Sequence, residues 1–287
     1  MRFISIFSLL MMILSGCASG QKEDRDAIAV SFDPQAWMIK QISGDDFDII
    51  TLLPPGTDPE TYQPSIGTMK SLGNAKVFFS LGTSGFEHRI SDNIHSNFPE
   101  LKIADCADGI EKITGTHEYH SGTNGHDHQE DFDPHMLSSI RNCIIIAENM
   151  TQTLMRVRPD KAAQYRTAGN DLKEKLMAMD DSIVSMDIKG KAFAIRHPSL
   201  SYFARDYGLI QINLQADGKE ASPLQLRKRM EEMKGSDTKV FIIEKEHSSA
   251  GDKETARQLD LKTIDVSLNS SSWLDNLMET ANEINRD

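Results

Sequence analysis

Short apolar runs rich in β-favouring residues alternate with segments of helical spacing along this chain, and the alternation occurs twice. In the first half, four strand-like runs bounded by Gly, Pro, Asp or Asn lie at 27–32, 47–53, 76–82 and 101–106. Segments whose apolar residues recur at helical spacing lie between them, at 34–42, 65–75 and 86–98. Strands separated by helices predict a parallel sheet, because parallel neighbours need a long crossover connection.

The second half of the chain repeats this pattern. Four further strand-like runs lie at 192–195, 209–214, 239–244 and 261–266. Helical segments follow them near 199–207, 223–234, 252–259 and 271–284. Two such sets predict an α/β protein of two similar lobes, each with a roughly four-stranded parallel sheet flanked by helices. A content of 39% hydrophobic residues is sufficient for both cores.

Two segments of helical pattern, 133–157 and 159–186, connect the two sets. Pro159 suits the first turn of a helix, where its missing N–H is not needed, and Gly169 is the single glycine of the second segment. We therefore expect an N-terminal lobe, a long rigid linking helix and a C-terminal lobe, at 27–158, 159–187 and 188–287. Open α/β sheets bind ligands beyond the carboxyl ends of their strands, so a cleft between the lobes is the expected binding site.

The first residues have the pattern of an export signal. A positively charged start is followed by an apolar run at 3–14 that is too short to span a bilayer as a helix. The run ends in Leu-Ser-Gly before Cys17, which resembles a bacterial lipoprotein signal. We expect removal of 1–16, lipidation of Cys17, and a flexible tether of small and charged residues over 17–26. The alternative is an ordinary signal peptide with an incidental cysteine.

The charge balance excludes some partners. With 43 acidic and 31 basic residues the formal net charge is −12, which disfavours binding to nucleic acid or to anionic lipid and modestly favours cations. Apart from Cys17, the cysteines are Cys106 and Cys143, and neither lies in a CxxC-type metal motif. In an oxidising compartment these two can form a disulfide, and the sequence leaves their pairing open.

Imidazole and carboxylate groups follow several of the predicted strands or precede a helix. Glu60 lies in the loop after the second strand, His135 at the start of a helix, His197 after the strand at 192–195, and Asp265 at the end of the last strand. These donors suit zinc, manganese or iron. Taken singly, each has an ordinary explanation as a hydrogen-bonded histidine or a helix cap. His247 also lies near a strand end and can substitute as a ligand, but we interpret it as a solvated loop histidine.

Four spaced motifs together resemble the zinc/manganese solute-binding proteins of ABC importers. The motifs are the run 53–65, the run 75–82 with Glu87, the triplet Asp133-Pro134-His135, and His197 with the run 202–209. The resemblance covers essentially the whole chain after the signal, and it implies two lobes with a metal in the cleft.

The resemblance assigns ligands residue by residue. His135 and His197 match the family motifs at the histidine itself. Glu60 stands where the family commonly has His, so its carboxylate would replace an imidazole. Asp265 corresponds to an Asp near the last strand, but Val266 follows it where the family often has Pro.

The identity of the metal depends on two features with opposite tendencies. Glu60 makes the ligand set richer in oxygen, which keeps manganese or iron open as cargo. A polar segment over 116–130 favours zinc, because it resembles the histidine-rich loop of the zinc members and collects imidazoles at His117, His120, His126 and His128. A solvated insertion of biased composition is the alternative interpretation of that segment. We expect zinc.

The resemblance implies a binding protein and no enzyme. We expect an exported monomer, lipid-anchored to a membrane and facing the periplasm, that captures zinc and delivers it to the permease and ATPase of an ABC importer. A zinc-dependent hydrolase is the rival from another class, but the chain lacks a His-Glu-x-x-His segment, and Glu60 is the only obvious general base. A metal-binding adhesin or metallochaperone is the second alternative.

Overall fold

The computed structural model describes residues 25–82, 85–114, 132–215 and 221–286. The expected signal peptide, the lipidation site at Cys17 and the four histidines of 116–130 lie outside these residues. Arg25, at the end of the expected tether, donates a hydrogen bond to the carbonyl of Asp45 (2.7 Å). Within the described ranges, none of the helices combines the length and the apolar character needed to cross a membrane.

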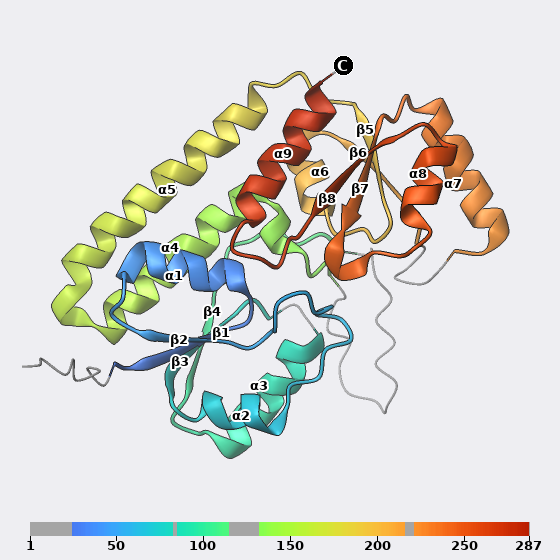
Figure 1. Cartoon of the computed structure of the whole chain (residues 1–287). Helices are drawn as coiled ribbons and strands as arrows, with labels where there is room; N and C mark the ends of the chain where they lie inside the picture. The colour runs from blue at the N-terminus through green and yellow to red at the C-terminus, as the bar shows by residue number, and fades with distance from the viewer. Residues whose placement is uncertain (1–24, 83–84, 115–131, 216–220, 287) are drawn as a thin grey trace, which may run out of the picture.

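The N-terminal lobe is built on a parallel sheet of four strands in the order β2-β1-β3-β4. Its strands are β1 (Ala27–Val30), β2 (Asp48–Thr51), β3 (Ala75–Ser80) and β4 (Lys102–Asp105). Its connecting helices are α1 (Asp33–Ser43), α2 (Ile66–Leu72) and α3 (Gly85–Asn97). Figure 1 shows α1 on one face of the sheet and α2 and α3 on the other. All four strands lie within the runs predicted from the sequence, except that β3 begins one residue earlier.

The C-terminal lobe repeats this arrangement with a parallel sheet in the order β6-β5-β7-β8. Its strands are β5 (Ala192–Ile195), β6 (Ile210–Asn213), β7 (Val240–Glu244) and β8 (Lys262–Val266). Its helices are α6 (Ser201–Tyr207), α7 (Pro223–Gly235), α8 (Asp252–Gln258) and α9 (Trp273–Asn285). The two predicted sheets are therefore confirmed, and both have the same strand order.

Side-chain alternation divides the core of the C-terminal lobe. Ala192 and Ala194 of β5 point to the face covered by α7 and α8, where a small separate core forms. Phe193 and Ile195 point to the opposite face, and the core on that side is continuous with that of the N-terminal lobe. Because strand side chains alternate between faces, the central strand β5 must be apolar throughout.

The connection between the lobes differs in detail from the prediction. The helix expected from residue 133 is a 3₁₀ turn, η1 (Met136–Ser138), followed by α4 (Ile140–Val157). Asp133 instead holds a local turn before η1, because its carboxylate accepts the backbone N–H of His135 (2.8 Å). Ser139 then caps α4 by accepting the N–H of Asn142 (3.0 Å).

The predicted long linking helix is confirmed, although its first turn is a 3₁₀ turn and it ends at Val184. A 3₁₀ turn, η2 (Pro159–Lys161), precedes α5 (Ala162–Val184), which has 23 residues. α5 packs along α4 and α1 and reaches α9 near its end (Figure 1). Gly169 allows the close approach of α4, because a Cβ at this position would lie 2.5 Å from Thr151 Oγ1.

Direct contacts also join the two lobes. The ring of Trp37 in α1 meets that of Trp273 in α9 edge to face, with centroids 5.2 Å apart. Tyr202 of α6 donates a hydrogen bond to the carbonyl of Asp133 (2.9 Å) and accepts one from the N–H of Ile113 (3.2 Å). These contacts fix how the carboxyl ends of the two sheets face each other.

Candidate metal centre

Two histidines of the C-terminal lobe stand at the carboxyl ends of its central strands. His197 follows β5 after a single intervening residue, and its side chain is 2% exposed. His247 ends a 3₁₀ turn, η3 (Lys245–His247), which directly continues β7. Because β5 and β7 are neighbours in the sheet, the two imidazoles stack with ring centroids 4.2 Å apart.

The N-terminal lobe contributes a carboxylate and a third histidine. Glu60 lies in the loop between β2 and α2, where its N–H donates to Asp58 Oδ1 (2.8 Å) and so forms a local turn. His135 lies immediately before η1, in the segment that Tyr202 joins to α6. Its ring centroid is 5.0 Å from that of His197.

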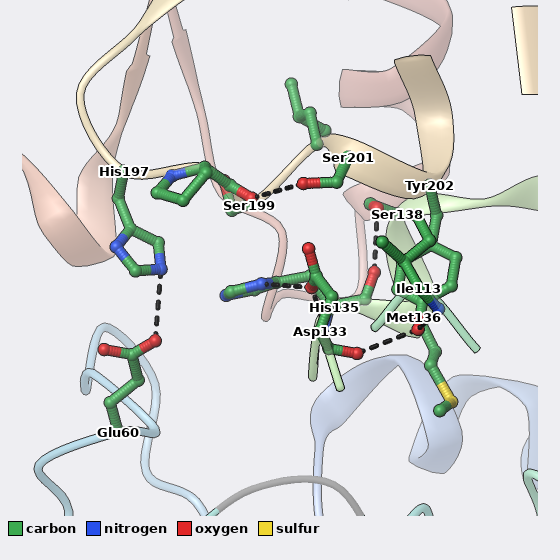
Figure 2. Close-up of polar contacts among 12 residues, drawn as sticks. Glu60, Ile113, Asp133, His135, Met136, Ser138, His197, Ser199, Ser201 and Tyr202 are labelled. Atoms are coloured by element: carbon green, nitrogen blue, oxygen red, sulfur yellow. Dashed lines mark hydrogen bonds and ion pairs between the residues drawn. The ribbon is translucent and has the colours of Figure 1, made fainter. Parts of the chain in front are cut away.

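These groups are close enough to share one ion. One ring nitrogen from each of His135, His197 and His247 lies within 4.8 Å of the other two. Glu60 Oε1 lies 3.2 Å from His197 Nε2 (Figure 2). Two ligand atoms each about 2.1 Å from a tetrahedral zinc ion lie roughly 3.4 Å apart, so the ring nitrogens would approach one another by up to about 1.4 Å on binding.

Neighbouring side chains aim two of the imidazoles at this point. His135 Nδ1 donates to Asp133 Oδ1 (2.8 Å, Figure 2), and His197 Nδ1 donates to Gln215 Oε1 (3.0 Å). In both rings Nε2 is left as the atom that faces the cluster, which is the usual arrangement of metal-binding histidines. His247 Nε2 is buried without a hydrogen-bond partner among the described residues. A cavity of about 30 Å³ lies beside the cluster and is lined in part by Glu60, His135 and Glu244.

The cluster shifts the protonation of its members in different directions. Burial raises the pKa of Glu60, but the hydrogen bond and charge of His197 outweigh it and lower the pKa to about 2. Burial lowers the pKa of His135, but Asp133 and the more distant carboxylates outweigh it and raise the pKa to about 9. Burial and the charge of His197 lower the pKa of His247 to about 4. Near neutral pH, Glu60 is therefore ionised, His135 charged and His247 a neutral donor.

The structure brings together Glu60, His135 and His197 but does not bring Asp265 to them. Asp265 is exposed in β8, opposite Ile243 of β7, whereas its neighbours Ile264 and Val266 point into the core. Strand alternation thus directs its carboxylate to solvent, and its expected role as the fourth ligand has no support from this placement.

His247 lies with the cluster, since one of its ring nitrogens is within 4.8 Å of those of His135 and His197. Its side chain is only 9% exposed, so the interpretation as a solvated loop histidine is wrong. A signal for this was present in the sequence, because His247 follows its strand after two intervening residues, almost as closely as His197, which follows the neighbouring strand after one. Cys106 and Cys143, whose pairing was open, are separate buried thiols.

The fold and this cluster define a two-lobed α/β metal-binding protein with donors from both lobes at the carboxyl ends of its sheets. Comparison with known families agrees, since the family described as zinc-uptake complex component A, periplasmic, matches residues 28–286. The chain belongs to this family.

Curated relatives are distant in sequence. The zinc-binding protein AdcA of Streptococcus pyogenes serotype M3 is 26% identical over 225 residues, which are 70% of this chain and 42% of that protein. The zinc-binding lipoprotein AdcA of Streptococcus pneumoniae serotype 4 is 26% identical over 278 residues, 89% of this chain and 52% of that protein. The chain thus spans about half the length of these relatives. A putative metal-binding protein of Chlamydia trachomatis serovar D is 29% identical over 224 residues, 76% of each chain.

Solved structures share the fold. A crystal structure of ZnuA superposes with a TM-score of 0.80 at 24% identity, covering 91% of this chain and 98% of the other. The protein FpvC from Pseudomonas aeruginosa, in complex with Mn²⁺, gives a TM-score of 0.73 at 22% identity, covering 91% of this chain and 96% of the other. At these identities the likeness supports the two-lobed architecture and not the choice of metal.

Proposed function

We propose that this protein captures a divalent transition metal, zinc in the first place, and delivers it to an ABC importer. The observation that carries the proposal is the convergence of three imidazoles and one carboxylate from four separate segments between the lobes. Such a convergence of buried donors is costly unless they bind an ion, because their desolvation must be compensated. The family description and the AdcA relatives support zinc.

The proposed ligands are Glu60, His135, His197 and His247. Three nitrogen donors and one carboxylate oxygen suit zinc in tetrahedral coordination. This set has one imidazole more and one carboxylate less than expected from the sequence, so it favours zinc over manganese more strongly than Asp265 would have done.

The role of Glu60 supports metal binding without catalysis. A zinc hydrolase keeps one coordination position open for water and places a general base beside it. Here Glu60, the only base suggested by the sequence, contacts His197 and belongs to the ligand set itself. The family consists of uptake components, and this also favours binding over hydrolysis or adhesion.

The proposed setting follows from the N-terminal sequence. After removal of 1–16, a lipid on Cys17 would hold the monomer at a membrane facing the periplasm, beside a permease and its ATPase. The histidine-rich segment 116–130 would collect zinc weakly ahead of the cleft. The lobes 27–158 and 188–287 would hold the ion between them, around the linking segment 159–187, and release it when they shift against the permease.

Elemental analysis of the purified chain, followed by competition among zinc, manganese and iron, tests this function. We expect one tightly bound zinc per chain, with affinity lowered on the order of 100-fold or more in His197→Ala and in His247→Ala, because each loses one of four ligands. His88→Ala on α3, outside the cluster, serves as the matched control. A wild-type chain that binds no metal tightly, or unchanged tight binding in both cluster variants, would contradict the proposal.

A further inference from the structure

A second carboxylate lies beside the proposed ligands. Glu244 is the last residue of β7, and its side chain is 3% exposed. Together with Glu60 and His135 it lines the cavity next to the cluster. Neither the sequence motifs nor the assigned ligand set gives it a role.

The two oxygens of Glu244 have different surroundings. Oε2 accepts a hydrogen bond from the hydroxyl of Ser199, a fully buried residue two positions after His197. Oε1 lies 4.0 Å from His247 Nε2, one of the proposed donor atoms. Ligand atoms about 2.1 Å from one ion and roughly 90–110° apart lie about 3.0–3.4 Å from each other, so a movement of about 1 Å would bring Oε1 into the same coordination sphere. Ser199 thus fixes one oxygen and leaves the other directed at the ion position.

The burial of this carboxyl needs an explanation. A buried ionised carboxylate is costly unless it is paired or bound to a metal. Among the described residues, Glu244 forms no ion pair with a lysine or arginine, and the imidazole of His247, 4.0 Å away, is neutral near pH 7 because its pKa is lowered to about 4. Burial raises the pKa of Glu244 to about 7, although the charge of His135 opposes this. A divalent cation in the cluster would supply the missing positive charge.

We propose that Glu244 provides a second carboxylate oxygen to the bound cation and thereby determines which divalent metals the site accepts. This inference rests on the proposed function. With Glu60 and Glu244 both ionised, the two negative charges balance a divalent ion, and the donor set becomes three nitrogens and two oxygens. Manganese and iron(II) prefer oxygen-rich sets with more than four ligands, whereas zinc is satisfied by the remaining three imidazoles and Glu60.

The substitution Glu244→Gln tests this role, because glutamine keeps the volume and can still accept the hydrogen bond of Ser199. Zinc and manganese affinities are measured by competition with a chromophoric chelator on the chain lacking 1–16. We expect manganese to bind at least about tenfold more weakly and zinc to change by less than about threefold. Bound Co²⁺ should also change its absorption spectrum toward that of a four-coordinate ion, a readout that a merely structural residue would not alter.

Two further variants complete the experiment. Asp265→Asn, which removes an exposed carboxylate of the same lobe, should leave both affinities and the Co²⁺ spectrum unchanged. Glu244→Asp should restore part of the manganese affinity, and it replaces Glu244→Gln as the test if that variant fails to fold. Equal changes for zinc and manganese with an unaltered Co²⁺ spectrum would overturn the role of Glu244. A wild-type chain without tight metal binding would instead overturn the proposed function.

Discussion

The two lobes have the same strand order but supply their donors in different ways. In the C-terminal lobe, His197 and His247 follow the ends of adjacent strands almost directly, so the sheet itself sets their separation. In the N-terminal lobe, Glu60 lies in a long loop and His135 precedes a 3₁₀ turn, so hydrogen bonds must fix them. One half of the proposed site is therefore set by the backbone ladder and the other by side-chain contacts.

The two lobes also differ in the pKa values of their histidines. His135 of the N-terminal lobe has a pKa of about 9, because Asp133 stabilises the charged imidazole. His247 of the C-terminal lobe has a pKa of about 4, because burial and the charge of His197 disfavour its protonation. The C-terminal histidine is thus ready to bind a metal, whereas the N-terminal one must first lose a proton.

The largest expected effect is the pH dependence of metal affinity. Because His135 must give up its proton, affinity should rise about tenfold per pH unit from about pH 7, the pKa of Glu244, toward about pH 9, the pKa of His135. At pH 8, above the pKa of Glu244 and below that of His135, calorimetry in two buffers of different ionisation enthalpy should detect about one proton released per ion. His135→Gln should release none, and His247→Gln should release as many as the wild type. Equal proton release by both variants would contradict the proposal that His135 is protonated and His247 neutral before the metal binds.

The metal-free fold should respond to pH in the opposite sense. The pKa of His135 is raised above its ordinary value of 6.5, so its charge stabilises the fold fully below pH 6.5, and this contribution is lost as the pH rises through 9. The melting temperature of the metal-free chain should fall as the pH rises from 6.5 to 9. Over the same range, the increase in melting temperature caused by zinc should become larger, because zinc binds more tightly at higher pH.

The next effect concerns the groups that orient the imidazoles. Asp133→Asn should weaken zinc binding about 10- to 100-fold above pH 9, because the neutral amide makes His135 a less basic ligand. The difference in zinc affinity between Asp133→Asn and the wild type should become smaller at lower pH. In the variant, His135 loses its proton more easily because the carboxylate of Asp133 no longer stabilises the charged imidazole. Gln215→Leu, the matched change beside His197, should weaken binding to an extent that does not depend on pH in this way. Chelator competition at several pH values distinguishes the two patterns, and parallel curves for both variants would count against the comparison.

The smallest effect tests the hydrogen bonds that join the lobes. Tyr202→Phe removes the hydroxyl that links Ile113 and Asp133 of the N-terminal lobe to α6. Chemical denaturation should show a loss of about 1–3 kcal/mol, because a buried donor and acceptor lose their partner. Tyr62→Phe on the N-terminal lobe is the control, and equal stabilities of the two variants would mean that this contact contributes nothing.

The fold was largely predictable because buried parallel strands are apolar on both faces. The run 192–195 was expected as a strand and is β5 from end to end, since both of its faces are covered. The start of α4 was predicted too early, because the backbone of Ser139 is extended (φ −107°, ψ 123°) and its side chain caps the helix that begins after it. A backbone interruption of this kind leaves no trace in hydrophobic periodicity.

The site was predictable only in part. His135, His197 and Glu60 stand at helix or strand ends, and the structure gathers them. The choice between Asp265 and His247 depended on which face of β8 is turned inward, and a shift of one residue exchanges the two faces. No count of residues along the chain decides that register. It follows from the packing of Ile264 and Val266 against the shared core.

Both tryptophans of the chain stand where α1 meets α9, and Trp273 is fully buried there. Tryptophan fluorescence therefore reports on the contact between the two lobes. If release of the ion separates the lobes, water reaches the indole of Trp273 and its emission shifts to longer wavelength. If the emission stays constant while the metal leaves, the ion departs through local movement of the loop that carries Glu60, and the lobes behave as one body throughout transport.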